Sequence, residues 1–363
     1  MLITKKEELK NYYLQTRQWQ GIPAFAITAS GRAFACFYSG AKTEDLGNYC
    51  VLIMSDDGGE TWGDAIAVAY FGENSRAYDP CVWIDPKGRL WFYYSATPQQ
   101  KVYAVVCENP DASKLTWSEE REIGGEVLLN KPTIMTNGEW WFPSAVWGKG
   151  LMEDSPELKE IYRGLDKRKI VREAFAFVSV DEGKTFEKRG GVATKARSFD
   201  EHQFLELSDG RVAMYIRTEY GICVSYSSDG GYTWSEEKDT GIFSPNTRFF
   251  IRRLLSGNVL LISHQKSEDP QTPNLRTKLT AFISKDDGKT WGSSLLLDER
   301  ANVSYPDGQE ENREIYVIYD RDRKGAGEIL LAKFKEEDVF LKEIKGNGYL
   351  QKTITKLIDA KKE

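Results

Sequence analysis

Short runs of ionisable residues stand where several strands are expected to begin, and they hold the side chains best suited to chemistry. The run Asp200-Glu201-His202-Gln203 places a carboxylate beside an imidazole. Groups of these two types are the ones that most often transfer protons in enzymes. His202 fits one of two roles, either proton transfer or hydrogen bonding that supports a neighbouring group. We predict that Glu201 and His202 are catalytic residues.

Two other candidates suit an acidic ligand. Arg217 stands where a β-rich run passes into a loop, and a guanidinium that faces inward can bind a carboxylate through paired hydrogen bonds. Tyr305 precedes Pro306. Its phenol has an ordinary pKa of roughly 10, so it needs a neighbouring carboxylate or cation in order to react near neutral pH. The alternative role of Tyr305 is a rigid strand start, because proline restricts the residue before it.

One turn motif occurs four times, with the pattern Ser-x-Asp-x-Gly-x-Thr-aromatic. The aspartate can accept hydrogen bonds from nearby backbone N–H groups, the glycine adopts a conformation that a Cβ opposes, and the aromatic ring packs on the adjacent sheet. The copies lie at 55–62, 179–186, 227–234 and 284–291. Because a turn explains every residue of the motif, we predict that its aspartates are structural and do not bind a metal.

A second signal is a tight turn of the type polar-Gly-polar between two β-rich runs. It recurs six times, at Gly31, Gly88, Gly138, Gly210, Gly257 and, in degenerate form, Arg313. Successive copies lie 57, 50, 72, 47 and 56 residues apart. Such turns indicate hairpins, and repeats of this length are typical of propeller blades. We therefore predict an all-β fold, a six-bladed β-propeller whose blades are four-stranded antiparallel sheets.

The whole chain, 1–363, is predicted to form this single domain. Its blades are expected at about 19–66, 78–120, 129–190, 200–237, 246–293 and 303–335. The longest interval between turns contains a charge-rich, helix-compatible segment, which predicts a helical insertion at 150–173 in the third blade. Short helical segments are expected near both chain ends.

The turn signals also predict which end of the propeller holds the site. If both kinds of turn lie on one face, the starts of the innermost strands lie on the other face, together with the loops between second and third strands. Both histidines of the chain fall in those positions. Such a concentration of polar groups predicts a central pocket. Besides Arg217, the candidates for binding the substrate are Arg76, Lys131, Arg248, His264, Arg276 and Asp307.

The four repeated motifs resemble the Asp boxes of the sialidase (neuraminidase) superfamily. The resemblance implies a β-propeller whose Asp boxes lie away from the active site. It also implies a tyrosine nucleophile paired with a glutamate, an aspartate acid/base, and three arginines that bind the substrate carboxylate. Tyr305 matches the place of the nucleophile and Glu201 that of its partner. Arg217 and Arg276 match the second and third arginines.

The chain departs from the superfamily at one position and leaves another open. Members usually open with Arg-Ile-Pro, whereas this chain has Gly21-Ile22-Pro23, so the first arginine is absent there. A carboxylate would lose a charge-assisted partner as a result, which predicts a changed substrate. The acid/base has three candidates, Glu44, Asp45 and Asp79, and we predict Asp79 to be catalytic.

Three functions remain open. The first is an exo-acting glycoside hydrolase that removes a terminal acidic sugar, of sialic acid or uronate type, from a glycan. The second is a polysaccharide lyase that cleaves beside a glucuronate, for example in a rhamnosyl-glucuronate linkage, with His202 or Tyr305 taking the C5 proton. The third is a glycan-binding propeller without catalysis, because a fold alone does not determine function.

Composition limits the partners. The net charge of −6 and the lack of a long basic run disfavour nucleic acid, and no apolar run is long enough to predict a membrane span. The five cysteines form no Cys-x-x-Cys pair, and the N-terminus has no apolar signal core. We expect a cytoplasmic protein that acts on an oligosaccharide or glycoconjugate and requires no metal or other cofactor.

Overall fold

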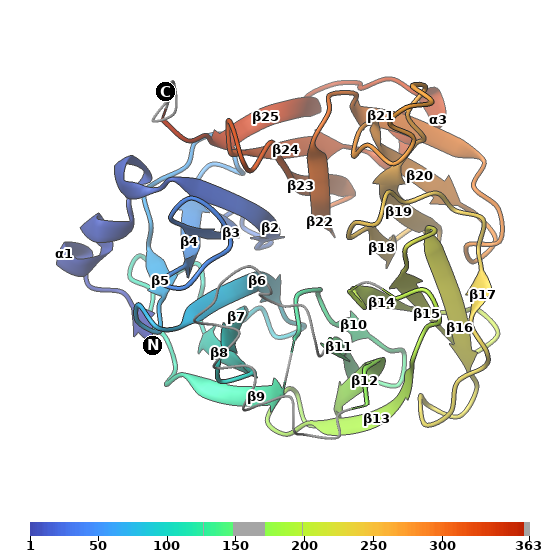
Figure 1. Cartoon of the computed structure of the whole chain (residues 1–363), viewed down its shortest axis with the longest axis horizontal. Coiled ribbons are helices and arrows are strands. Elements are labelled where there is room, and N and C mark those ends of the chain that lie inside the picture. Colours follow the sequence, from blue (N-terminus) through green and yellow to red (C-terminus); the bar gives the residue numbers. More distant parts are fainter. Residues whose placement is uncertain (126, 148–170, 198, 359–363) are drawn as a thin grey trace.

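Six antiparallel β-sheets surround a central axis in the computed structural model of the chain (Figure 1). The structure describes residues 1–125, 127–147, 171–197 and 199–358. The sheets follow one another around the ring in chain order, and each runs outward from the axis. The predicted six-bladed β-propeller is confirmed.

Each blade begins with its innermost strand. In chain order the strands of the first three blades are β2 (Trp19–Ile27), β3 (Ala33–Gly40), β4 (Tyr49–Ser55) and β5 (Ala67–Ala69); β6 (Arg76–Ile84), β7 (Leu90–Thr97), β8 (Lys101–Cys107) and β9 (Arg121–Gly125); and β10 (Thr133–Ile134), β11 (Trp140–Val146), β12 (Glu173–Ser179) and β13 (Glu187–Val192). Those of the last three are β14 (His202–Glu206), β15 (Val212–Arg217), β16 (Ile222–Ser227) and β17 (Lys238–Asp239); β18 (Phe250–Arg253), β19 (Val259–His264), β20 (Leu279–Ser284) and β21 (Ser293–Asp298); and β22 (Val303–Glu311), β23 (Glu314–Arg321), β24 (Glu328–Phe334) and β25 (Tyr349–Thr355).

The chain ends add to the first and last blades. Strand β1 (Leu2–Ile3) pairs with β5, so the first sheet has five strands and not the predicted four. The outer strand of the sixth blade is β25, which lies beyond the segment 303–335 where the sequence predicted that blade. The prediction ended the blade early because a helix, α3 (Glu336–Leu341), separates β24 from β25.

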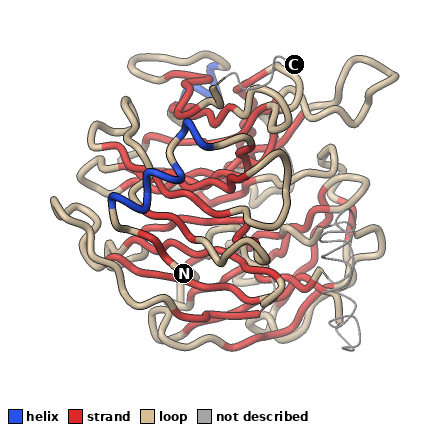
Figure 2. The backbone as a smooth tube through the Cα atoms, turned by 60° about the vertical axis from the view of Figure 1, so that its left-hand side comes forward, coloured by secondary structure: helices blue, strands red, loops and turns tan. Residues whose placement is uncertain are grey.

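Among the described residues, helices are few and short. Helix α1 (Lys6–Leu9) and two 3₁₀ turns (Lys10–Tyr12 and Leu14–Thr16) lie between β1 and β2 in the chain, and they lie with α3 at the periphery of the strands (Figures 1 and 2). Most of the helical insertion predicted at 150–173 lies outside the described residues. Glu173, its last residue, is not helical but begins strand β12. Among the described residues no helix is long and apolar enough to cross a membrane.

The repeated motif forms the turn that its residues predict. In the copy at 227–234, Ser227 Oγ accepts a 2.8 Å hydrogen bond from the Gly231 N–H, and Asp229 Oδ1 accepts one of 3.0 Å from the Thr233 N–H. The Thr233 hydroxyl donates to Asp229 Oδ2 at 2.6 Å, and these bonds lower the pKa of Asp229 to about 2. Gly231 has a φ of 86°, which a side chain would oppose. The motif therefore fixes the link between the outer strands of a blade.

Aromatic rings fill the interfaces between blades. Trp83 of the second blade meets Trp140 of the third edge to face, with ring centroids 4.9 Å apart. Trp141, on the opposite side of the third blade, meets Phe204 of the fourth at 5.4 Å. Edge-to-face packing places the positive edge of one ring against the negative face of another. These contacts hold the sheets in a ring and keep the axial ends of their inner strands in place.

Candidate active site

Three innermost strands carry the same irregularity near the axis. The pairing of β2 with β3, of β6 with β7, and of β22 with β23 each shifts register just before or at a proline. The residue before each proline has a positive φ, 55° at Ile22, 49° at Asp79 and 55° at Tyr305. Left-handed backbone is costly for a β-branched or bulky residue, and bulges of this kind redirect side chains at functional sites. Two of the three are predicted catalytic residues.

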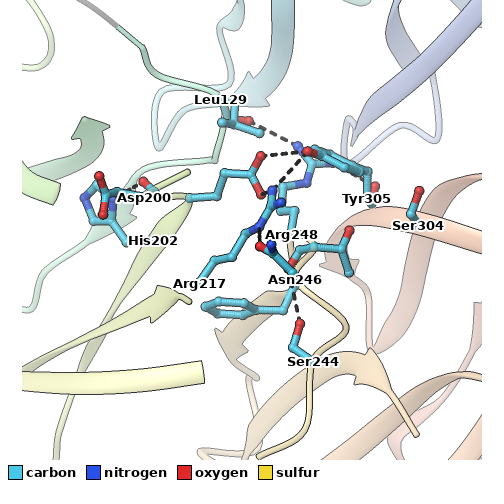
Figure 3. A network of polar contacts seen from close by, with 12 residues as sticks. Leu129, Asp200, His202, Arg217, Ser244, Asn246, Arg248, Ser304 and Tyr305 are labelled. Atoms are coloured by element: carbon cyan, nitrogen blue, oxygen red, sulfur yellow. Dashed lines mark hydrogen bonds and ion pairs between the residues drawn. The ribbon is translucent and has the colours of Figure 1, made fainter. Parts of the chain in front are cut away.

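The Tyr305 phenol lies within a buried polar network (Figure 3). Its hydroxyl donates a 2.8 Å hydrogen bond to Glu201 Oε1, and Arg217 Nη1 donates to Glu201 Oε2 at 2.6 Å and to Tyr305 Oη at 3.1 Å. The three residues come from β22, the segment before β14, and the end of β15. All are more than nine-tenths buried. The structure thus brings together three of the residues that the sequence singled out.

Burial and charge set the acidity of this phenol. Burial, followed by the charge of the Glu201 carboxylate, raises the pKa of Tyr305 to about 12, although the guanidinium groups of Arg217, Arg323 and Arg276 act in the opposite direction. Tyr305 is therefore a neutral phenol at neutral pH. It can act as a nucleophile only if its proton moves to Glu201 as the oxygen reacts, and the existing hydrogen bond supplies that path.

Several cations surround the Tyr305 ring. The guanidinium carbon of Arg323 lies 4.1 Å from the ring centroid, that of Arg248 at 5.3 Å and that of Arg276 at 5.6 Å. Asn246 links Arg276 to Arg217. Its side-chain oxygen accepts a 2.9 Å bond from Arg217 Nε, and its backbone carbonyl accepts a 3.0 Å bond from Arg276 Nη2. Arg323 was not predicted from the sequence. Its signal was the polar loop after β23, of which only the start was considered.

A pocket of about 270 Å³ opens beside this network. Its charged lining consists of Arg276, Arg323, Lys324, Glu44 and Asp322, and Trp19 contributes a ring. The remaining lining residues are Thr43, Asn302 and Ser304, the last of which precedes Tyr305. Such a volume suits a single sugar ring better than a long chain, and the cluster of cations suits an anionic group.

Two of the three candidate acid/base residues lie in the same region. Asp79 is buried, and burial followed by the charges of Glu44 and Glu201 raises its pKa to about 7. Glu44 lines the pocket, with its carboxylate 3.7 Å from Arg76 Nη1 and 3.8 Å from Arg323 Nη1. Asp45 instead bonds to the backbone N–H of the next residue, Leu46. A carboxylic acid with a pKa near 7 is matched to proton donation at neutral pH.

Arg76 lies behind the pocket lining. Its side chain is 2% exposed, and its guanidinium carbon lies 4.5 Å from the Tyr78 ring centroid and 5.7 Å from that of Tyr38. Glu44 is its ion-pair partner. Arg76 thus reaches the site through the carboxylate of Glu44 and does not itself line the pocket.

Arg248 supports the site from beneath. It is fully buried, and its Nη2 donates to the carbonyl of Tyr305 at 2.8 Å and to that of Pro23 at 2.7 Å. Nη1 lies 3.4 Å from the Leu129 carbonyl (Figure 3). Arg248 therefore ties together backbone from the first, third and sixth blades and fixes the bulge that carries Tyr305.

The two histidines lie apart from the pocket. His202 Nδ1 is 3.0 Å from the Asp200 carbonyl and Nε2 is 3.0 Å from the Phe175 carbonyl, on the far side of the network from Tyr305 (Figure 3). His264 Nε2 is 2.9 Å from the Val303 carbonyl. Burial lowers the pKa of each to about 4. Both therefore remain neutral and serve as hydrogen-bonding links between strands.

Lys131 and Asp307 form a buried ion pair. Asp307 Oδ2 also accepts a 2.9 Å bond from the Phe25 N–H. Neither residue lines the pocket. Their pair joins the third, sixth and first blades near the axis. Among the described residues, no group of three or more His, Cys, Asp or Glu side chains is arranged to hold a metal ion.

Comparisons with known proteins agree with this architecture. The model of the BNR repeat-like domain matches residues 32–317. The chain is 27% identical over 334 residues to the sialidase of Micromonospora viridifaciens, a match covering 79% of this chain and 48% of that protein. The chain thus spans about half the length of this curated relative.

Solved structures give the same picture at lower identity. The Hadza microbial sialidase Hz136 aligns with a TM-score of 0.65 and 18% identity, over 88% of this chain and 66% of its own. The intramolecular trans-sialidase of Ruminococcus gnavus aligns with a TM-score of 0.64 and 13% identity, over 93% and 98%. At these identities the likeness is one of fold.

Proposed function

The chain belongs to the family of BNR repeat-like domains, and from that premise we propose that it is a sialidase-like glycosidase. It removes a terminal acidic sugar, of sialic acid or uronate type, from an oligosaccharide or glycoconjugate. The observation that carries the proposal is the hydrogen bond from the Tyr305 hydroxyl to Glu201 Oε1, with Arg217 Nη1 donating to Glu201 Oε2 and to Tyr305 Oη. The geometry suits a phenol that loses its proton as it attacks.

In the first step the Tyr305 oxygen bonds to the anomeric carbon while its proton passes to Glu201. The bond to the leaving oxygen breaks, and Asp79 gives that oxygen a proton. In the second step water attacks the anomeric carbon, Asp79 takes a proton from the water, and Glu201 returns its proton to Tyr305. Two displacements at one carbon retain its configuration. The pKa of about 7 at Asp79 supports a role as acid and then as base.

Arg276 and Arg217 are proposed to bind the carboxylate of the sugar. Arg276 lines the pocket. Within the described part of the chain Arg217 donates hydrogen bonds from Nε and Nη1, which leaves its Nη2 group for the ligand. A carboxylate between guanidinium groups forms charge-assisted hydrogen bonds, which are the strongest that side chains offer. The pocket volume supports recognition of one terminal residue and therefore exo action.

The lyase alternative has two candidate bases, His202 and Tyr305, and the surroundings of His202 argue against the first. His202 has both ring nitrogens beside main-chain carbonyls and a pKa lowered by burial, so it is poorly placed to take a proton from a sugar. That alternative would depend on Tyr305 alone. The binding-module alternative gives no account of a tyrosine held in strained backbone against a buried glutamate.

One incubation separates the three functions. The protein is mixed with a panel of sialosides and uronate-terminated oligosaccharides in ¹⁸O-labelled water, and the products are analysed by mass spectrometry. The proposal predicts a free acidic sugar that carries ¹⁸O at its anomeric carbon. An unsaturated uronate formed without uptake of water would establish the lyase, and an intact panel would favour a binding module. Tyr305→Phe serves as the matched control.

A further inference from the structure

The backbone of Gly21 is covered by a side chain from the opposite end of the sequence. A Cβ at position 21 would lie 2.5 Å from Arg323 Cδ, 2.8 Å from Cγ and 2.7 Å from Nε. A Cβ atom does not approach non-bonded atoms this closely in a folded protein, so a side chain at position 21 and the observed position of Arg323 exclude one another. The φ of Gly21 lies outside the left-handed region, so the glycine is required here for space and not for conformation.

Neighbouring groups hold Arg323 in this space. Arg323 Nε donates to Asp320 Oδ2 at 2.7 Å, and Nη2 lies 3.1 Å from Ser304 Oγ. Asp320 is itself fixed, because it accepts bonds of 2.7 Å from the Ser304 hydroxyl and 2.7 Å from the Ile22 N–H. The guanidinium is therefore preorganised against the face of the Tyr305 ring, beside the bulge of β2.

The far end of Arg323 remains available to a ligand. Arg323 lines the pocket, and Nη1 donates no hydrogen bond within the described part of the chain. Its nearest charged partner is Glu44 Oε1 at 3.8 Å, which is too long for a hydrogen bond. Arg276 lines the same pocket, and burial, followed in part by the charges of Arg323 and Arg217, lowers the pKa of Arg276. An anion between these cations would relieve their repulsion.

We propose that Arg323 binds the carboxylate of the acidic sugar together with Arg276, from the space that the glycine at position 21 leaves open. This inference rests on the proposed function, since it deepens the recognition of the same substrate. It makes Gly21 and Arg323 a coupled pair, in which the glycine contributes only by making room. Arg323 then supplies the guanidinium that is missing at position 21.

The test is a binding cycle with isothermal titration calorimetry. The probes are N-acetylneuraminic acid, glucuronic acid and the methyl ester of each, which removes the charge. We expect Arg323→Ala to weaken binding of the acid about tenfold or more, as for loss of a hydrogen bond to a charged group, and to leave the ester nearly unchanged. Gly21→Ala should weaken binding of the acid in the same direction, because the new Cβ displaces Arg323.

The double variant and a control decide the outcome. If Gly21 acts only through Arg323, then Gly21→Ala adds no further loss in the Arg323→Ala background. Arg321→Ala is the matched control, since Arg321 lies two residues away and pairs with Glu328 outside the pocket lining. The affinity of Arg321→Ala for the acid should stay within about twofold of the wild-type value, as expected for a residue without contact to the ligand. Thermal unfolding of each variant shows whether it folds. Arg323→Lys keeps the charge but lacks the forked donors of a guanidinium, so its affinity for the acid should lie between those of wild type and Arg323→Ala.

The experiment distinguishes failure of this inference alone from failure of the proposed function. A wild-type protein that binds or cleaves an acidic sugar while Arg323→Ala binds it equally well overturns this inference and leaves the proposed function standing. This inference is also overturned if Gly21→Ala weakens binding of the acid by the same factor in the Arg323→Ala background as in the wild-type protein. A wild-type protein that neither binds nor cleaves any acidic sugar overturns both.

Discussion

The hydroxyl of Tyr305 donates a 2.8 Å hydrogen bond to Glu201, a residue 104 positions earlier in the chain. The two residues belong to the sixth and fourth blades, on the starts of innermost strands. Ring closure brings such starts to a common axis, so distant residues can form one reactive unit. Arg217 completes the unit from the end of β15. We therefore expect that substitution of any one of these three residues impairs the function of the whole unit.

The first prediction concerns that unit. Tyr305→Phe removes the nucleophilic oxygen, and Glu201→Gln removes the acceptor of its proton. Each should lower kcat at least about 10³-fold, and the double variant should be little worse than either single one, because residues that act as a unit are not additive. Steady-state kinetics with a substrate identified by the labelled-water experiment measure both.

Phenylalanine and glutamine keep the shapes of the original side chains, so folding should be preserved in these variants. Arg211→Ala, an exposed residue paired with Asp209, is the control and should leave kcat within about twofold, as expected for a surface change. Substantial activity of Tyr305→Phe would contradict the assignment of Tyr305 as nucleophile.

Local patterns made the fold predictable from the sequence. The Ser-x-Asp-x-Gly-x-Thr-aromatic turn depends only on residues within eight positions, and the structure forms the copy at 227–234 as those residues require. The fourth strand of the last blade was missed because β25 has no such turn before it and follows the helix α3. An N-terminal fifth strand as short as β1 carries no periodicity that could be recognised.

The candidate site was less predictable because it depends on side-chain direction. Position alone grouped His202 with Glu201, yet Glu201 stands just before β14 and meets Tyr305, whereas His202, the first residue of β14, faces the Phe175 carbonyl. Arg323 fills space above Gly21, a contact across 302 positions that no sequence period encodes. The departure from the Arg-Ile-Pro pattern indicated that an arginine is absent at position 21, but it did not point to Arg323.

A second prediction concerns Arg248. Arg248→Ala removes the donors to the carbonyls of Tyr305 and Pro23, both buried. An unsatisfied buried carbonyl costs about 1–3 kcal/mol, so the free energy of unfolding should fall by roughly 3 kcal/mol. Activity should fall as well, because the bulge at Tyr305 loses its support. Urea unfolding measures the first effect and kinetics at a temperature where the variant is folded measure the second. Full activity in the folded variant would show that Arg248 does not position Tyr305.

A third prediction separates the Asp boxes from the chemistry. Ser227→Ala removes a buried hydroxyl that accepts from the Gly231 N–H and donates to Asp229. The free energy of unfolding should fall by about 1–2 kcal/mol, while kcat and KM stay unchanged. Ser256→Ala, in an exposed turn where the hydroxyl accepts a 3.2 Å bond from the Asn258 N–H, is the matched control and should be nearly neutral. A change in KM for Ser227→Ala would place the box closer to the substrate than proposed.

The last prediction uses pH to decide between Asp79 and Glu44 as the acid. Burial and then the Glu44 charge raise the pKa of Asp79 to about 7, so Asp79 carries its proton below that pH and loses it above. If Asp79 is the general acid, kcat/KM falls as the pH rises through about 7. Asp79→Asn should remove that decline and lower the rate by about 10²–10⁴-fold, with the smallest loss for a nitrophenyl leaving group, which needs little protonation. Glu44→Gln should keep much of the activity and move the decline to lower pH, because one of the charges that raise the pKa is gone. A decline that vanishes in Glu44→Gln and persists in Asp79→Asn would instead assign the acid to Glu44.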